Sequence, residues 1–254
     1  MKIAVCIKQV PTRDWQPRAN EDRTWVRDQD ASFELNEPDA YALEEGLRLK
    51  EKHGGEVVVC SAGPARVAQA LREALARGAD RAIHVEDDAL AQGDAFAVAG
   101  ALAFAMRDEQ FDLVLTGLQS DDQGFAQTGV VLAGTLGIAS ATIIMEVDVR
   151  PGAVRVKREL EGGWFQFVTL PLPAVLTIQS GINQLRYATL KGIMSAKKKE
   201  IRKVAPPAGV PSRQRIISLY VPEKKKRTQM LAGTAAEAAG QLITKLRDEA
   251  RVIS

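Results

Sequence analysis

The first 140 residues alternate between short apolar runs and segments whose apolar residues recur at helical spacing. The apolar runs predict buried strands at residues 2–8, 56–61, 81–85 and 112–116. The helical spacing predicts helices at residues 38–52, 65–77, 94–106 and 123–136, with Asn36 able to cap the first. Strands that alternate with helices in this way predict a parallel sheet with helices on both faces.

The pattern changes after residue 140. Strands are predicted at residues 142–149, 154–160, 164–170 and 174–178 with no helix between them, and Glu161-Gly162-Gly163 is a hairpin turn. We expect these strands to extend the sheet in antiparallel fashion. Residues 11–35, which carry many charges, predict a long loop or a small hairpin.

The end of the chain differs from the rest. Residues 197–215 are rich in proline and charge and predict a linker, and residues 234–251 predict an amphipathic helix. A helix that follows such a tether commonly packs on another chain or on a remote surface of its own chain. We therefore predict two parts: an α/β domain over residues 1–196, which includes a segment at 184–199, and an arm over residues 197–254.

Charge and composition exclude several classes of protein. The net charge is +2, and the lysine runs at 197–199 and 224–227 have little aromatic interleaving, so nucleic acid is not expected as a partner. Cys6 and Cys60 lie in apolar runs and predict buried, reduced thiols. No stretch has the composition of a signal peptide or a bilayer-spanning helix, which favours a cytoplasmic protein.

The segment at residues 186–199 is the most informative part of the chain. It places the apolar residues Leu190, Ile193 and Met194 beside Lys197, Lys198 and Lys199, and it contains no His, Cys, Asp or Glu. An apolar anchor ringed by positive charge favours rapid encounter and modest affinity with a partner protein. The segment indicates docking rather than catalysis.

A second candidate site lies where parallel strands end. In an open α/β sheet ligands bind beyond the carboxyl ends of the strands, near helix N-termini. Residues 116–128 follow a predicted strand and are rich in glycine, amide and acidic side chains, which suits a phosphate or ribose; an ordinary capped turn is the alternative. No dinucleotide or P-loop motif, metal-ligand pattern or catalytic triad is present.

Several motifs together resemble the beta subunit of electron transfer flavoprotein, over essentially the whole chain. The order and spacing of the motifs also match, and Asn36-Glu37 and LTIQSGIN look most like beta subunits of methylotroph-type bacteria. The motifs are KIAVCIKQV (2–10), ALEEGLRLKE (42–51), SAGP (61–64), GADRAIHV (78–85), GLQSDDQGFAQTG (117–129), VKRELEGG (156–163) and RYATLKGIMSAKKK (186–199).

The resemblance implies a Rossmann-like fold of adenine-nucleotide-binding type and a heterodimer. An alpha subunit would hold most of one FAD, this chain would hold AMP, and a flavin-containing dehydrogenase would dock on it. By position, the resemblance implies a recognition loop made of Tyr187, Leu190 as anchor, Ile193, Met194 and Lys197–Lys199, and it implies that Glu159 would restrain a mobile flavin domain. The nucleotide pocket uses Cys6, Asn36, Glu37, Pro38, Asp39, Ala62, Gly117, Leu118, Gln119, Ser120, Asp121, Asp122, Gln123, Gly124, Phe125, Ala126, Gln127 and Thr128.

The sequence departs from the family's motifs at two places, and two other functions remain as alternatives. The family's Asn-Glu-Pro-Arg-Tyr is here Asn183-Gln184-Leu185-Arg186-Tyr187, so the entry to the recognition loop lacks its proline. The electron-bifurcating branch holds a second FAD in place of AMP; Gln123 and Phe125 depart from its pocket motif and favour AMP. The alternatives are thus a bifurcating subunit and a stand-alone nucleotide-sensing α/β protein.

Overall fold

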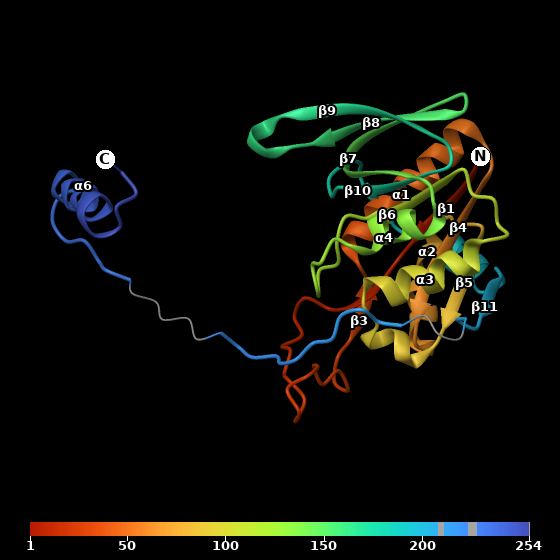
Figure 1. Ribbon diagram of the computed structural model, residues 1–254, viewed down its shortest axis with the longest axis horizontal. Coiled ribbons are helices and arrows are strands. Elements are labelled where there is room, and N and C mark those ends of the chain that lie inside the picture. Colours follow the sequence, from red (N-terminus) through yellow and green to blue (C-terminus); the bar gives the residue numbers. More distant parts are fainter. Residues whose placement is uncertain (208–210, 223–227, 254) are drawn as a thin grey trace. The chain divides into compact units, whose positions relative to one another are not determined.

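The computed structural model describes residues 1–207, 211–222 and 228–253, and it contains two compact units, Met1–Ile217 and Ser218–Ser254. The first unit is built on a nine-stranded sheet with the order β11-β5-β4-β1-β6-β10-β7-β8-β9 (Figure 1). Its strands are β1 (Lys2–Cys6), β4 (Glu56–Gly63), β5 (Arg81–Glu86), β6 (Leu113–Gly117), β7 (Ala139–Arg150), β8 (Ala153–Glu159), β9 (Phe165–Pro171), β10 (Ala174–Ile178) and β11 (Ile201–Val204). Its longer helices are α1 (Glu37–His53), α2 (Ala68–Arg77), α3 (Ala95–Met106) and α4 (Thr128–Leu136).

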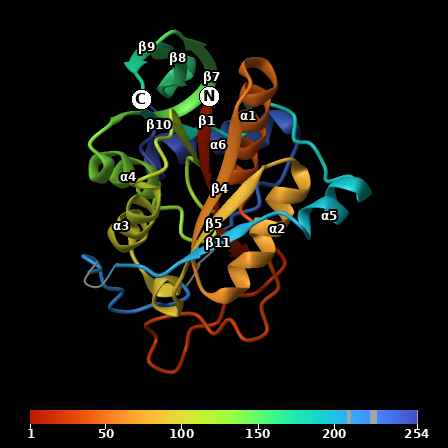
Figure 2. The ribbon, with the colours of Figure 1, turned by 90° about the vertical axis from the view of Figure 1, so that its right-hand side faces the viewer.

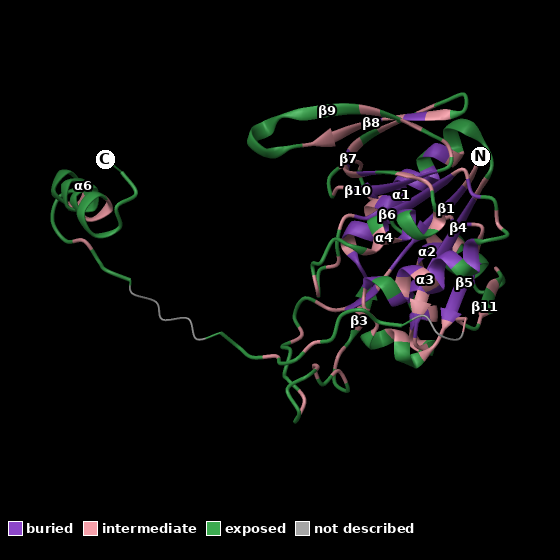
Figure 3. Cartoon of the chain, viewed as in Figure 1, coloured by how far each residue is buried: buried purple, intermediate pink, exposed green. Residues whose placement is uncertain are grey.

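The centre of the sheet is parallel and is covered on both faces, as predicted. Alternate residues of β1 serve two different cores: Ile3 and Val5 pack with α1 and α2, whereas Ala4 and Cys6 pack with α3 and α4. Because both faces are covered, the central strands have mostly apolar and buried interiors (Figure 3). The predicted α/β fold with helices on both faces is therefore confirmed.

The prediction for the later strands was partly wrong. β10 was expected to extend the sheet in antiparallel fashion, but it lies in the middle and pairs in parallel with β6 and with the first residues of β7. All five of its residues are buried, which a strand at an open edge does not require. The antiparallel extension is confirmed for β7, β8 and β9, and the turn at Glu161–Gly163 joins the last two.

Two ordered elements lie where loop or linker was predicted. Residues 201–204 form β11, which pairs in parallel with β5 at the edge of the sheet, so the first unit extends beyond the boundary expected at residue 196. Residues 190–196 form helix α5 (Leu190–Ala196), which packs on α2 (Figure 2). Residues 11–35 follow the prediction, because β2 (Gln9–Pro11) and β3 (Phe33–Leu35) form a small antiparallel pair around a long loop.

The second unit contains helix α6 (Ala235–Thr244), followed by a π-helical turn over Lys245–Glu249. Thr234 and Glu237 form a capping box that fixes the start of α6. Leu242 and Ile243 are about half exposed. The predicted helix is confirmed in position, although its regular part ends earlier than expected; the lysine run at 224–227 lies outside the described residues. Among the described residues, no helix is long and apolar enough to cross a membrane.

Candidate functional site

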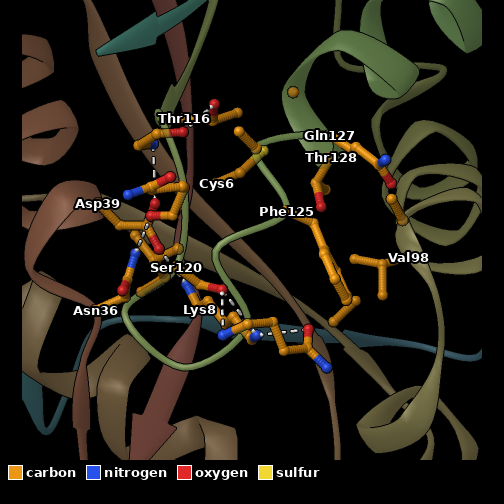
Figure 4. Close-up of a pocket in the computed structure, with 18 of the residues that line it drawn as sticks. Cys6, Lys8, Asn36, Asp39, Val98, Thr116, Ser120, Phe125, Gln127 and Thr128 are labelled. Atoms are coloured by element: carbon orange, nitrogen blue, oxygen red, sulfur yellow. Dashed lines mark hydrogen bonds between the residues drawn. The ribbon is translucent and has the colours of Figure 1, made fainter. Parts of the chain in front are cut away.

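A pocket lies at the carboxyl ends of β1, β4 and β6, beside the first turns of α1 and α4 (Figure 4). This is the position at which ligands bind in open α/β sheets. The loop over residues 118–127 forms one wall, and the start of α3 forms the wall opposite. Phe125 of the loop extends across toward Val98 of α3 (Figure 4).

Asp39 joins the three elements that form the floor of the pocket. Its carboxylate accepts the backbone N–H of Lys8 at 2.7 Å and the backbone N–H of Gly117 at 2.8 Å, which ties the ends of β1 and β6 to the first turn of α1. A Cβ at position 117 would lie 2.5 Å from Asp39 Oδ1, so this approach needs glycine. Burial raises the pKa of Asp39 to about 6, although the two N–H groups and Lys8 act in the opposite direction.

The loop over residues 118–127 is held by two side chains from other elements. Asn36 donates to the carbonyl of Gln119 at 3.1 Å and accepts the N–H of Asp121 at 2.9 Å. The Lys8 ammonium contacts Ser120 Oγ, Asp122 Oδ1 and Gln123 Oε1 at 3.2, 2.7 and 3.1 Å. Asn36 was expected to cap α1 with its side chain; it occupies the N-cap position, but its side chain binds the loop instead.

Charge pairs give the loop a second attachment. Arg13 pairs with Asp121 at 3.5 Å and also with Glu37 in the first turn of α1. Burial opposes ionisation of Asp122, but the Lys8 charge and the hydrogen bonds outweigh it and lower the pKa of Asp122. The loop is therefore anchored by cations from outside it at both acidic residues.

Helix α4 begins at Thr128, five residues later than predicted, because residues 123–127 belong to the loop. Gln127 occupies the N-cap position and makes no side-chain capping bond, so the amides of the first turn are not capped by it. A Cβ on Gly129 would lie 2.7 Å from Thr116 Oγ1 and Thr177 Cγ2, so glycine allows this turn to approach β6 and β10. Uncapped amides at a helix N-terminus suit an anion.

The structure brings most of the predicted pocket residues together. Those that line the pocket are Cys6, Asn36, Asp39, Ala62, Gly117, Leu118, Gln119, Ser120, Gln123, Phe125, Ala126, Gln127 and Thr128. Glu37, Pro38, Asp121, Asp122 and Gly124 stand beside it and are not part of the lining. Sequence reasoning missed the wall formed by Leu90, Ala91, Gly93, Ala95, Val98 and Leu102, and also Ile7 and Gly129. The cap Asp94 before an alanine-rich helix was the available signal for that wall.

The predicted docking residues form an exposed surface on and around α5. Tyr187, Leu190, Ile193 and Met194 have exposed fractions of 87%, 82%, 45% and 71%. Lys197 and Lys198 are exposed as well. Lys199 differs, because its ammonium donates to the carbonyls of Leu75 and Ala79 at 3.1 and 2.5 Å.

Glu159 lies at the end of β8, where its carboxylate accepts a hydrogen bond from Gln179 Nε2 at 3.2 Å.

Among the described residues, no group of three or more His, Cys, Asp or Glu side chains could hold a metal ion. The two arrangements that stand out are a pocket with an apolar wall beside the start of α4 and an apolar surface flanked by lysines. Their chemistry suits binding a ligand and a partner.

Comparison with known proteins gives a consistent result. Residues 24–208 match the family described as electron transfer flavoprotein domain. The chain is 40% identical to the electron transfer flavoprotein subunit beta of Methylophilus methylotrophus over 96% of this chain and 97% of the relative. It is 37% identical to the human protein of that name, over 99% of each chain, and 35% identical to the Bacillus subtilis protein, over 90% of this chain and 91% of the relative.

Proposed function

Because the chain belongs to the family of electron transfer flavoprotein beta subunits, we propose that it accepts electrons from a flavin-containing dehydrogenase and passes them to a downstream acceptor. It works with an alpha subunit in electron transfer and is an electron carrier, not an enzyme in its own right. In this proposal the redox-active FAD is held mainly by the alpha subunit, and this chain supplies the docking surface and the nucleotide pocket.

The exposed surface of α5 carries the docking proposal. Leu190 is 82% exposed and Met194 is 71% exposed, beside the exposed cations Lys197 and Lys198. An isolated chain gains nothing by exposing such side chains, but a partner with an apolar pocket and an acidic rim would bury them. An apolar anchor with a charged rim suits a partner that binds quickly and leaves after transfer.

Truncation of the anchor tests this role. In the assembled electron carrier, Leu190→Ala is expected to cost about 2 kcal/mol of docking, or roughly thirty-fold in affinity for the dehydrogenase. FAD content and thermal unfolding should not change. Ile217→Ala removes another apolar side chain that is 81% exposed and serves as the control. Flavin reduction by the dehydrogenase that proceeds unchanged with Leu190→Ala would remove the docking role.

For the pocket we favour one adenine nucleotide, AMP, with its phosphate on the amides of the first turn of α4. The uncapped start of that helix and the apolar wall at Val98 and Phe125 support this assignment. A second FAD in the same pocket is the alternative, and it would make the chain part of an electron-bifurcating complex.

Nucleotide analysis separates these outcomes. Mass spectrometry of nucleotides released from the heterodimer should find one AMP for each FAD, whereas two FAD and no AMP would support bifurcation. Gly129→Ala should reduce AMP content because its Cβ displaces the first turn of α4. Gly134→Ala, in the same helix but with nothing near the added Cβ, should retain it. A heterodimer that contains only one FAD would contradict both assignments.

The C-terminal unit is proposed to pack on the alpha subunit. Leu242 and Ile243 of α6 are about half exposed, and burial on a partner would remove this apolar area from water. Deletion of residues 230–254 should weaken the heterodimer, measured by sedimentation. If the shortened chain binds alpha as tightly as the full chain, this role is wrong. A stable full chain that never assembles with alpha would instead support the stand-alone nucleotide sensor.

Glu159 is the proposed restraint on the flavin-bearing domain of alpha. Its carboxylate stands at the end of the β8–β9 ribbon and, within the part of the chain that the structure describes, accepts a hydrogen bond from Gln179. Glu159→Ala should change the rate of electron transfer after docking and leave the affinity for the dehydrogenase unaltered. An altered affinity with an unaltered transfer rate would assign Glu159 to the docking surface instead.

A further inference from the structure

Helix α5 buries very little of itself. It has seven residues, of which only Ala196 is buried, while Leu190, Ile193 and Met194 face outward. Its start is capped by Thr189, whose hydroxyl accepts the N–H of Gly192 at 3.0 Å. A helix of two turns is unstable alone in water. Its order must come from the body of the protein.

Gly192 of α5 lies close against the end of α2. A Cβ at this position would lie far inside contact distance of the Ala76 carbonyl oxygen, near the end of α2. Gly192 is not in the left-handed region of backbone conformation, so glycine is required here by the contact and not by the turn. The close approach lets the two helices lie side by side, with Ala196 buried in the same apolar cluster as α2.

A basic side chain from each segment also binds the carbonyl groups at the end of the other helix. Arg72 of α2 donates to the carbonyls of Ala196 and Lys199 at 2.5 and 2.6 Å. In return, Lys199 donates to the carbonyls of Leu75 and Ala79. Each helix thus receives a positive charge at the carbonyls of its last turn, where such a charge is favourable. Burial lowers the pKa of Lys199 because its ammonium is partly withdrawn from water.

The other end of the segment is fixed to α1. The Arg186 guanidinium pairs with Glu44 at 2.7 Å and with Glu51 at 2.6 Å. Glu44 is nearly buried, so this pair is sheltered from water. Hydrogen bonds to Glu44 and Glu51 raise the pKa of Arg186. These pairs hold the entry to α5 against α1.

We propose that Gly192, Arg72 and Lys199 are positioning residues that lock α5 on α2 in the orientation that presents Leu190 to an electron-donating flavoprotein. This inference rests on the proposed docking role of Leu190. A surface held in its bound conformation avoids the entropy cost of ordering on docking. The proposal also gives the three consecutive lysines two roles. Lys199 holds α5 on α2, while Lys197 and Lys198 contact the partner.

Gly192→Ala distinguishes the lock from a helix that merely folds locally. Alanine is the better helix former, so a locally folded α5 would dock as well as before or better. With the lock, the added Cβ pushes α5 away from Ala76, and the KM of the dehydrogenase for the assembled carrier should rise at least tenfold while kcat at saturation is kept. Gly134→Ala, whose Cβ meets nothing within 4 Å, is the matched control and should leave KM unchanged.

A lysine pair gives a second test if Gly192→Ala fails to fold. Lys199→Gln should raise KM and leave the salt dependence of association as it is, because its charge does not face the partner. Lys198→Gln should slow association and flatten its salt dependence. Equal effects of the two substitutions on salt dependence would contradict the lock.

Different results would contradict the positioning role of Gly192, Arg72 and Lys199 and the docking role of Leu190. If Leu190→Ala weakens docking while Gly192→Ala and Lys199→Gln do not, the lock is wrong and the docking role stands. If Leu190→Ala has no effect, the docking role is wrong and the lock has no partner to serve. Nucleotide content and thermal unfolding, measured on each variant, report whether the fold is kept.

Discussion

Asp39 gives the most direct test of the electrostatics of the pocket. Its carboxyl is buried, and its pKa rises from 3.8 to about 6. The native protein therefore holds a proton on Asp39 more tightly than the unfolded chain does, so stability falls as pH rises from about 4 to about 6. The full change corresponds to about 3 kcal/mol at 1.36 kcal/mol per pKa unit.

Asp39→Asn removes this titration and keeps the shape of the side chain. Between pH 5 and pH 7 the stability of the native aspartate protein should fall by about 1.3 kcal/mol relative to the variant. The comparison is needed because burial also raises the pKa of Glu45, which adds a pH dependence common to both proteins. Only the difference between the two proteins isolates Asp39.

Urea unfolding followed by circular dichroism at pH 5, 6 and 7 measures that difference. The two proteins need the same concentration and the same nucleotide content, because assembly and bound ligand both shift apparent stability. A difference that stays constant, or that moves in favour of aspartate as pH rises, would mean that the hydrogen bonds from Lys8 and Gly117 outweigh burial. The carboxylate would then be ionised throughout this range.

Three further predictions concern the same unit. Gly117→Ala should destabilise the fold by about 2 kcal/mol or more, seen as a lower thermal midpoint, because its Cβ collides with Asp39; an unchanged midpoint would contradict the close approach. The hydrogen bond from Arg81 lowers the pKa of Glu109 to about 2, so Glu109→Gln should cost stability at pH 7, with a cost that vanishes as pH falls from 4.5 toward 2. Burial raises the pKa of Cys60 to about 12, so native protein at pH 8 should resist alkylation there, and peptide mass spectrometry should find the adduct only after unfolding.

The parallel core could be predicted because burial on both faces leaves a plain signal. The strands at residues 56–61 and 112–116 have unbroken apolar centres, residues 57–60 and 113–115, and are bounded by polar residues. Their burial on both faces of the sheet therefore follows from their composition. Position within the sheet leaves a weaker signal. β10 follows an antiparallel ribbon along the chain, and only its largely apolar composition, AVLTI, distinguishes it from the strands before it.

The pocket was predicted on one side only. Residues 117–128 carry small and amide side chains that indicate a ligand, but the opposite wall at Val98 and Leu102 consists of alanine and aliphatic residues that also suit a core. The side chain of Asn36 shows a second limit. Its sequence context fits a helix cap, yet the acceptor and donor of the distant loop compete for the same amide.

The place of β10 has a consequence for the order of synthesis. As the chain leaves the ribosome, β6 emerges long before residues 174–178, and its open edge has no permanent neighbour until they arrive. Such an edge is a template for wrong pairing during this interval. The carboxyl-terminal third of the first unit thus completes the middle of the sheet, and a message cut before codon 174 would yield a product without a closed core.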